Sequence, residues 1–166
     1  MTRPGDAGPP AAKELPSGWG FANRQTGDIR SADAAPVSGG SMKKKVLVVE
    51  DDFDNRRIVA KVLAVEGYRV VEATDGLEAL SQVQAEHPDL ILMDLALPNL
   101  DGWEATRRLK KDPQTHRIPV VALTAVAMRG DEERARAAGC DDYLSKPARP
   151  AAIRAMVKKY IGTAAC

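Results

Sequence analysis

Apolar and polar residues form two patterns that alternate along residues 43–162. Five short apolar runs have the length of strands and occur at residues 45–50, 68–73, 89–94, 118–124 and 141–146. After the first run, apolar residues return at helical spacing, at Ile58, Val59, Val62, Leu63 and Val65. This spacing predicts a helix that ends at Gly67, and further helices are predicted at residues 74–87, 101–112, 129–139 and 147–162.

The regular alternation of strands and helices indicates the fold. A run such as KVLVVE is apolar at adjacent positions, which is typical of a strand buried on both faces of a parallel sheet. Parallel neighbours need a crossover connection, and each predicted helix between two strands provides one. We therefore predict an α/β fold, a doubly wound sheet of five parallel strands with five helices on its two faces. In such sheets, ligands bind at the carboxyl ends of the strands.

Residues 1–42 differ in composition from the rest of the chain. They contain 7 of the 13 glycines and 5 of the 11 prolines, and no strand or helix periodicity continues through them. Such a segment buries too little apolar area to offset the entropy of ordering it. We expect a disordered tail at 1–42, an ordered domain at 43–162 and a short C-terminal tail at 163–166. Met42 is a second candidate for the translation start, which would place the tail upstream of the native protein.

Composition and charge argue against several kinds of partner. The formal net charge of +1 gives no reason to expect binding to nucleic acid. No apolar run approaches the roughly 18 residues of a membrane span, and the first residues lack the apolar core of a secretory signal. The two cysteines, Cys140 and Cys166, form no metal-binding motif. We expect a cytoplasmic protein, in which the stretch DEERARAA (131–138) is an exposed helix face with spaced ion pairs.

Polar residues gather where the predicted strands end. Six of them follow or end the first, third, fourth and fifth strands: Glu50, Asp51, Asp52, Asp94, Thr124 and Lys146. Carboxylates that face one another across two strands repel unless a cation lies between them, and hard oxygen ligands suit Mg²⁺. A lysine and a threonine hydroxyl opposite them are able to hold phosphoryl oxygens. An aspartate in such a site is able to accept the phosphoryl group itself, as an acyl phosphate.

Four blocks of the sequence resemble a known family. VLVVEDD, LILMDLALPNLDG, VVALTA and YLSKP, in this order and spacing, resemble the receiver domain of two-component response regulators. The resemblance covers about residues 43–162, and it is strongest to single-domain bacterial regulators of the cell-division type. It implies a flavodoxin-like (βα)5 fold and a signalling protein, not an enzyme, that accepts a phosphoryl group in a phosphorelay. The implied partner is a sensor histidine kinase or a histidine phosphotransfer protein.

The resemblance also implies a role for each matched residue. Asp94 is the implied phosphoacceptor, Lys146 its phosphate partner and Thr124 the switch hydroxyl. Tyr143 takes the place of the switch aromatic, and a cis peptide bond is expected before Pro147.

The remaining matched residues concern the metal and the lifetime of the phosphoryl group. Asp51, Asp94 and the backbone carbonyl of Ala96 are implied as ligands of Mg²⁺, with Glu50 binding it through water and Mn²⁺ as a substitute. Ala96 and Val126 occupy the two positions that influence hydrolysis in the family, and neither side chain hydrogen-bonds water. We therefore predict slow autodephosphorylation.

The output is expected to pass through protein contacts, because no effector domain follows the last predicted helix. The expected contact surface comprises the fourth helix, the fifth strand and the fifth helix, with no direct DNA binding. Two alternatives stay open: a receiver that binds partners without phosphate, and a phosphatase of the aspartyl-phosphate type. The second is disfavoured because such enzymes carry another aspartate two residues after the nucleophile, where this chain has Ala96.

Overall fold

The structure is a computed structural model that describes residues 42–125 and 130–164. Five strands and five helices alternate through these residues. The strands are β1 (Lys45–Val49), β2 (Arg69–Ala73), β3 (Leu90–Asp94), β4 (Val120–Thr124) and β5 (Asp142–Ser145). The helices are α1 (Phe53–Val65), α2 (Gly76–Glu86), α3 (Gly102–Lys111), α4 (Asp131–Ala138) and α5 (Pro150–Ile161).

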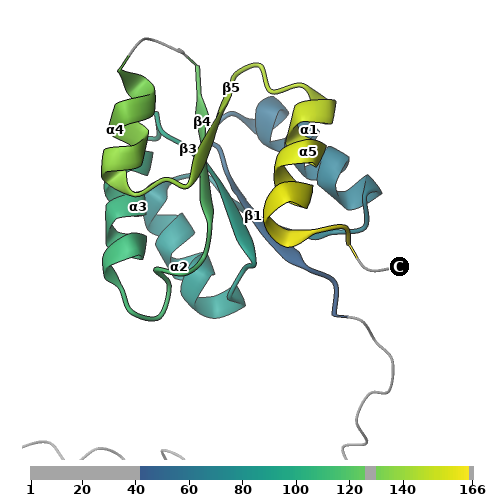
Figure 1. Cartoon of the computed structure of the whole chain (residues 1–166), viewed down its shortest axis with the longest axis horizontal. Coiled ribbons are helices and arrows are strands. Elements are labelled where there is room, and N and C mark those ends of the chain that lie inside the picture. Colours follow the sequence, from purple (N-terminus) through teal and green to yellow (C-terminus); the bar gives the residue numbers. More distant parts are fainter. Residues whose placement is uncertain (1–41, 126–129, 165–166) are drawn as a thin grey trace, which may run out of the picture. The chain divides into compact units, whose positions relative to one another are not determined.

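All five strands are parallel and lie in the order β2-β1-β3-β4-β5. Figure 1 shows the sheet between two helical layers, with α1 and α5 on one side and α2, α3 and α4 on the other. This strand order is that of flavodoxin-like sheets, and its topological switch point lies between β1 and β3. The predicted fold class is confirmed.

Side chains of the central strands are buried on both faces of the sheet. Leu47 and Val49 belong to the apolar cluster under α2, α3 and α4, whereas Val46 and Val48 belong to the cluster under α1 and α5. All four have no exposed surface, which explains why this strand is a continuous apolar run rather than an alternating one. Burial of apolar surface stabilises the folded state by about 25 cal/mol per Å². Because β1 packs against a core on each face, its end is held in place from both sides.

An aspartate caps the N-terminus of each of the first three helices. Asp52, Asp75 and Asp101 each accept a hydrogen bond of 2.8 Å from the backbone N–H three residues later. Such caps satisfy N–H groups that have no partner inside the helix, and each contributes about 1 kcal/mol. The helices can therefore begin within a few residues of the strand ends.

The element bounds differ from the predicted ones by up to three residues. β1 ends at Val49, so Glu50 lies just beyond it. α5 begins at Pro150, three residues later than predicted. The peptide bond before Pro147, in the preceding loop, is cis as expected. The predicted tail up to residue 41, the predicted start of the fourth helix at 129 and residues 165–166 lie outside the described residues. In the described part of the chain, no helix is long and apolar enough to cross a membrane.

Candidate functional site

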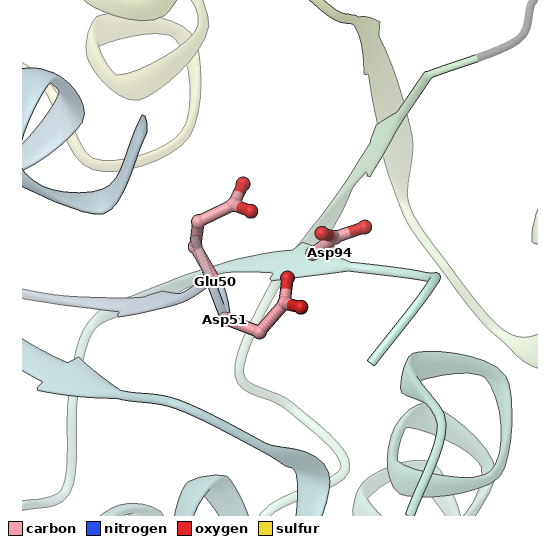
Figure 2. A group of neighbouring side chains, drawn as sticks. All are labelled: Glu50, Asp51 and Asp94. Carbon is pink, nitrogen blue, oxygen red and sulfur yellow. The ribbon is translucent and has the colours of Figure 1, made fainter. Parts of the chain in front are cut away.

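Three carboxylates lie together at the carboxyl ends of β1 and β3. Glu50 and Asp51 directly follow β1, and Asp94 is the last residue of β3. One oxygen from each carboxylate lies within 4.8 Å of the others, and Figure 2 shows the three side chains extending into the same region. Glu50 and Asp94 are 1% and 3% exposed, whereas Asp51 is exposed to solvent. Parallel pairing of β1 with β3 thus brings together residues that are far apart in the sequence.

The ammonium group of Lys146 lies against the two buried carboxylates. Its Nζ donates a hydrogen bond of 2.6 Å to Asp94 Oδ2 and lies 2.5 Å from Glu50 Oε2. The contact with Glu50 is a close ion pair to a buried oxygen for which, among the described residues, no other partner is found. Lys146 follows β5, and its backbone N–H donates to the carbonyl oxygen of Thr124 at 2.6 Å.

Burial and charge act against each other on this ion pair. Burial lowers the pKa of Lys146, but contacts with Asp94 and Glu50 outweigh this effect and hold that pKa above its usual value. Burial raises the pKa of Glu50, and the charge of Asp94 raises it further, against the opposing effect of Lys146. Lys146 therefore stays an ammonium at neutral pH, whereas Glu50 loses its proton less readily than an exposed glutamate does.

The charges at this site fit a divalent cation. The group has three carboxylates, and the ammonium of Lys146 contacts two of them, Glu50 and Asp94. Glu50 and Asp94 are buried, and the exposed Asp51 leaves the group open to solvent on one side. Hard oxygen donors with room for water are the surroundings that suit Mg²⁺.

The carboxylate of Asp94 is held from two sides. Its Oδ1 accepts a hydrogen bond of 2.9 Å from the backbone N–H of Ala96, while its Oδ2 contacts Lys146. Behind it, α3 approaches β3 so closely that a Cβ on Gly102 would lie 2.0 Å from the carbonyl oxygen of Asp94. Only glycine permits this approach. The close approach of α3 therefore fixes the backbone at Asp94, and the N–H of Ala96 and Lys146 orient its side chain. The role of the Ala96 carbonyl as a metal ligand stays a prediction.

The loop between β3 and α3 is also tied to the start of α2. Asn99 has a φ of 62° and donates a hydrogen bond of 2.8 Å from its side-chain amide to Asp75 Oδ2. Gly76 donates from its backbone N–H to the carbonyl oxygen of Leu100 at 3.1 Å, and a Cβ on Gly76 would lie 2.3 Å from that oxygen. Hydrogen bonds from the N–H of Glu78 and from Asn99 lower the pKa of Asp75, so it is a carboxylate at neutral pH. These contacts fix the side of the site that α2 and α3 form.

The predicted switch residues lie on neighbouring strands. Thr124 is the half-buried last residue of β4 and lines a pocket of about 230 Å³ together with Asp94. Tyr143 on β5 is half-buried, and its hydroxyl donates to Glu132 Oε2 on α4 at 3.3 Å. The charge of Glu132 raises the pKa of Tyr143. Val126 lies outside the described residues, so its predicted effect on phosphate lifetime is untested.

The same pocket has a rim that the sequence did not indicate. Trp103 on α3 and both Asp131 and Arg134 on α4 line it. The stretch 131–138 is predicted as a helix face with spaced ion pairs, and the contact of 2.7 Å between Arg136 and Glu132 confirms such a pair. Helical spacing does not indicate which charged side chain of such a face lies at a pocket, so Arg134 was missed.

Arg56 is a second residue near the site that sequence reasoning missed. Its Nη1 donates a hydrogen bond of 2.9 Å to the carbonyl oxygen of Glu50, and its Nε donates to Glu72 at 3.0 Å. These bonds connect α1 to the segment after β1 that carries Glu50 and Asp51. The sequence signal was weak, because an arginine in the first turns of a helix is usually an exposed residue.

The sequence of this chain is similar to those of known proteins. Residues 46–158 match the family model of the response regulator receiver domain. Among curated relatives, the polar-differentiation response regulator DivK from Brucella abortus (strain 2308) is 44% identical over 123 residues. The matched residues are 74% of this chain and the whole of that relative.

Two solved structures of similar chains share this fold. The receiver domain of the sensor histidine kinase PA1611 from Pseudomonas aeruginosa PAO1, solved with a magnesium ion in its active site cleft, is 38% identical. Its TM-score is 0.67, over 72% of this chain and 98% of that one. A co-crystal structure of Ypd1, a histidine phosphotransfer protein, and the receiver domain of Ssk1, both from Saccharomyces cerevisiae, gives 30% identity, a TM-score of 0.68 and coverage of 71% and 88%. The chain described here therefore belongs to the response regulator receiver domains of two-component signalling, and within that family it is similar to DivK.

Proposed function

We propose that this protein is a cytoplasmic phosphoacceptor in a phosphorelay, which receives a phosphoryl group on Asp94 from a histidine kinase or a histidine phosphotransfer protein. The observation that supports this most directly is the ammonium group of Lys146, 2.6 Å from Asp94 and 2.5 Å from Glu50. Receiver domains are signalling proteins rather than turnover enzymes. The proposed chemistry is accordingly a transfer to the protein's own side chain, followed by slow hydrolysis.

In the proposed transfer, a carboxylate oxygen of Asp94 attacks the phosphorus atom of a phosphohistidine. A P–O bond forms, the P–N bond breaks, and the imidazole nitrogen keeps the electron pair of that bond. Lys146 holds a positive charge beside the phosphoryl oxygens, and the N–H of Ala96 keeps the carboxylate in place. Because these groups are in position before the donor arrives, the transfer needs little reorganisation of the site.

Mg²⁺ is the cation that we propose for this site, with Mn²⁺ as a substitute. Asp51, Asp94 and the carbonyl of Ala96 would hold it directly, and Glu50 through water. When bound, the ion supplies positive charge to the phosphoryl oxygens. The proposal is supported by the three carboxylates, which have oxygens within 4.8 Å of one another, and by the magnesium ion in the PA1611 receiver domain.

Thr124 and Tyr143 are the proposed switch. A phosphoryl group on Asp94 draws the hydroxyl of Thr124 toward it, and Tyr143 turns inward from Glu132. The hydrogen bond to Glu132 is exposed and 3.3 Å long, so it is weak enough to be exchanged. This movement changes the surface formed by α4, β5 and α5, which we propose as the contact surface for a downstream protein rather than for DNA.

The donor is proposed to dock on α1. Phe53 and Ile58 are 59% and 54% exposed on this helix, a high value for large apolar side chains. Ile58 also lines a small pocket of about 90 Å³ together with Lys146 and Pro147, next to the phosphoacceptor. Exposed apolar side chains beside a reactive group suit an apolar partner surface. The occupant we propose is the helix that carries the phosphohistidine of the donor, and the Ypd1 co-crystal structure supports a partner of this kind.

Incubation with Mg²⁺ and a small acyl phosphate is expected to add one phosphoryl group to the wild type and none to Asp94→Asn. Asparagine keeps the shape of the side chain but lacks the nucleophilic carboxylate. Intact mass measures the outcome, and Asp52→Asn, which removes the same charge from the exposed cap of α1, should be phosphorylated normally. An unmodified wild type would indicate a phosphate-independent receiver, and continuous hydrolysis of a phosphate ester would indicate a phosphatase.

Mg²⁺ is expected to raise the melting temperature of the wild type by several degrees but to have little effect on Asp51→Asn. A ligand at about 100 times its dissociation constant adds about 2.7 kcal/mol to the free energy of unfolding. The matched control is Asp52→Asn, since asparagine also caps helices and Asp52 lies outside the carboxylate group. Thermal unfolding with and without Mg²⁺ measures the shift. An equal shift in both variants would contradict the assignment of Asp51.

Ile58→Lys is expected to slow phosphoryl transfer from a phosphorylated histidine phosphotransfer protein by about tenfold or more, because a charge replaces a central apolar contact. Phosphorylation by the small acyl phosphate should be unchanged, since that donor needs no docking surface. Val65→Lys is the control: Val65 is 71% exposed on the same helix, in its last turn. Equal transfer rates in the wild type and Ile58→Lys would exclude α1 as the docking site.

Ala96→Asn combined with Val126→Glu is expected to shorten the lifetime of the phosphoryl group by about tenfold or more, because both new side chains are able to position a water molecule. The loss of the added mass with time measures this lifetime. Wild-type protein that decays as fast as the double variant would show that these two positions do not slow hydrolysis.

A further inference from the structure

Arg134 lines the pocket at Asp94 but has no part in the function proposed so far. The pocket, of about 230 Å³, is bounded by Asp94 and Thr124 at the strand ends and by Trp103 and Arg134 on two helices. This volume has room for several water molecules, and so for a phosphoryl group attached to Asp94. The arginine is therefore a cation at the rim of the pocket that the phosphoryl group would enter.

Two weak contacts hold Arg134 in its present position. Its Cζ lies 5.1 Å from the centre of the Trp103 ring, which is a cation–π contact at an exposed site. Its Nη1 lies 3.8 Å from Asp131 Oδ1, and its side chain is 71% exposed. Long, exposed ion pairs of this kind contribute little. Arg134 is thus free to leave Trp103 when a stronger partner is present.

A phosphoryl group on Asp94 is such a partner. It carries a charge of about −1.5 to −2 and three strong acceptor oxygens, and the planar guanidinium group is able to bind two of these oxygens at once. We propose that Arg134 is a second phosphate-binding residue, which turns from the Trp103 ring to the phosphoryl group on Asp94. The inference rests on the proposed function, because it requires that Asp94 be phosphorylated.

α4 is suited to follow this movement because little holds it in place. Of its eight residues, Ala135 and Ala138 are buried, and its first turn has no side-chain cap at Gly130. A helix with so small a buried face shifts more easily than its neighbours do. Glu132, the hydrogen-bond partner of Tyr143, lies on the same helix. Movement of Arg134 would therefore also loosen the contact that holds Tyr143 in its outward position.

The fluorescence of Trp103 tests this inference. The chain contains two tryptophans, Trp19 and Trp103, so Trp19→Phe leaves Trp103 as the only indole emitter. In that background, Mg²⁺ and a small acyl phosphate are expected to change the emission of Trp103 as Arg134 leaves the ring. Adding Arg134→Gln should reduce this change to less than a third, while intact mass shows that Asp94 still gains its phosphoryl group.

Arg136→Gln is the matched control. Arg136 lies on the same helix, is 75% exposed and pairs with Glu132 at 2.7 Å, away from the pocket residues. This variant should keep the full emission change. An emission change of equal size in Arg134→Gln, or no change in phosphorylated protein with Arg134 intact, would overturn the inference and leave the proposed function standing. A protein without the mass gain would overturn the proposed function, and the inference with it.

Discussion

The contact of one ammonium group with two buried carboxylates is the interaction on which the rest of this site depends. Removing charged groups from water costs several kcal/mol for each of them, and pairing offsets this cost only when the geometry is good. Lys146 pairs closely with both Asp94 and Glu50, and Asp51 adds a third carboxylate nearby. The site is therefore left with excess negative charge. This excess is what makes binding of a cation favourable and what makes a phosphoryl group, which arrives with its own charge, a strong perturbation.

The fold supplies the rigidity that such a site requires. β1 and β3 are buried on both faces, so the residues at their ends do not move independently of the core. Behind Asp94, the close approach of Gly102 to the strand removes the space that a side chain would occupy. The hydrogen bond between Asn99 and Asp75 then ties the following loop to α2. Asp94 is held by the backbone on this side, and its side chain pairs with Lys146, which directly follows β5.

The sequence predicted the scaffold and the placement of the charged residues, for a physical reason. A buried parallel strand must be apolar at adjacent positions, so each strand is visible as a run, and its first polar residue marks the edge of the sheet. That rule places Asp94 and Lys146 at the same edge of the sheet, and in the structure the Lys146 side chain contacts Asp94. The particular roles of these residues came from the resemblance to receiver domains and not from spacing.

What the sequence did not indicate depends on side-chain direction. Arg134 and Arg136 are two residues apart in one charged stretch, yet one lies over Trp103 at the pocket and the other pairs with Glu132. Strand and helix bounds also differ from the predicted ones by a few residues, as at Glu50, which lies just beyond β1. Pattern gives the side of an element that faces the core. It does not give the position of an exposed side chain relative to a neighbouring element.

The two sides of the site differ in a way that explains how a local charge becomes a change of shape. On the side of α2 and α3, two closely packed glycines, Gly76 and Gly102, fix the loop after Asp94. The same loop is bonded to Asp75, which caps the start of α2. On the other side, α4 buries only small side chains and begins without a side-chain cap. The side with the weaker anchoring is expected to move more readily when new charge enters the pocket. Thr124 and Tyr143 lie on the strands next to that side, so a shift of α4 reaches the same surface that the switch residues alter. If Asp94 accepts a phosphoryl group as proposed, the surface around α4 is suited to report on it, because α4 buries only two small side chains that oppose a movement.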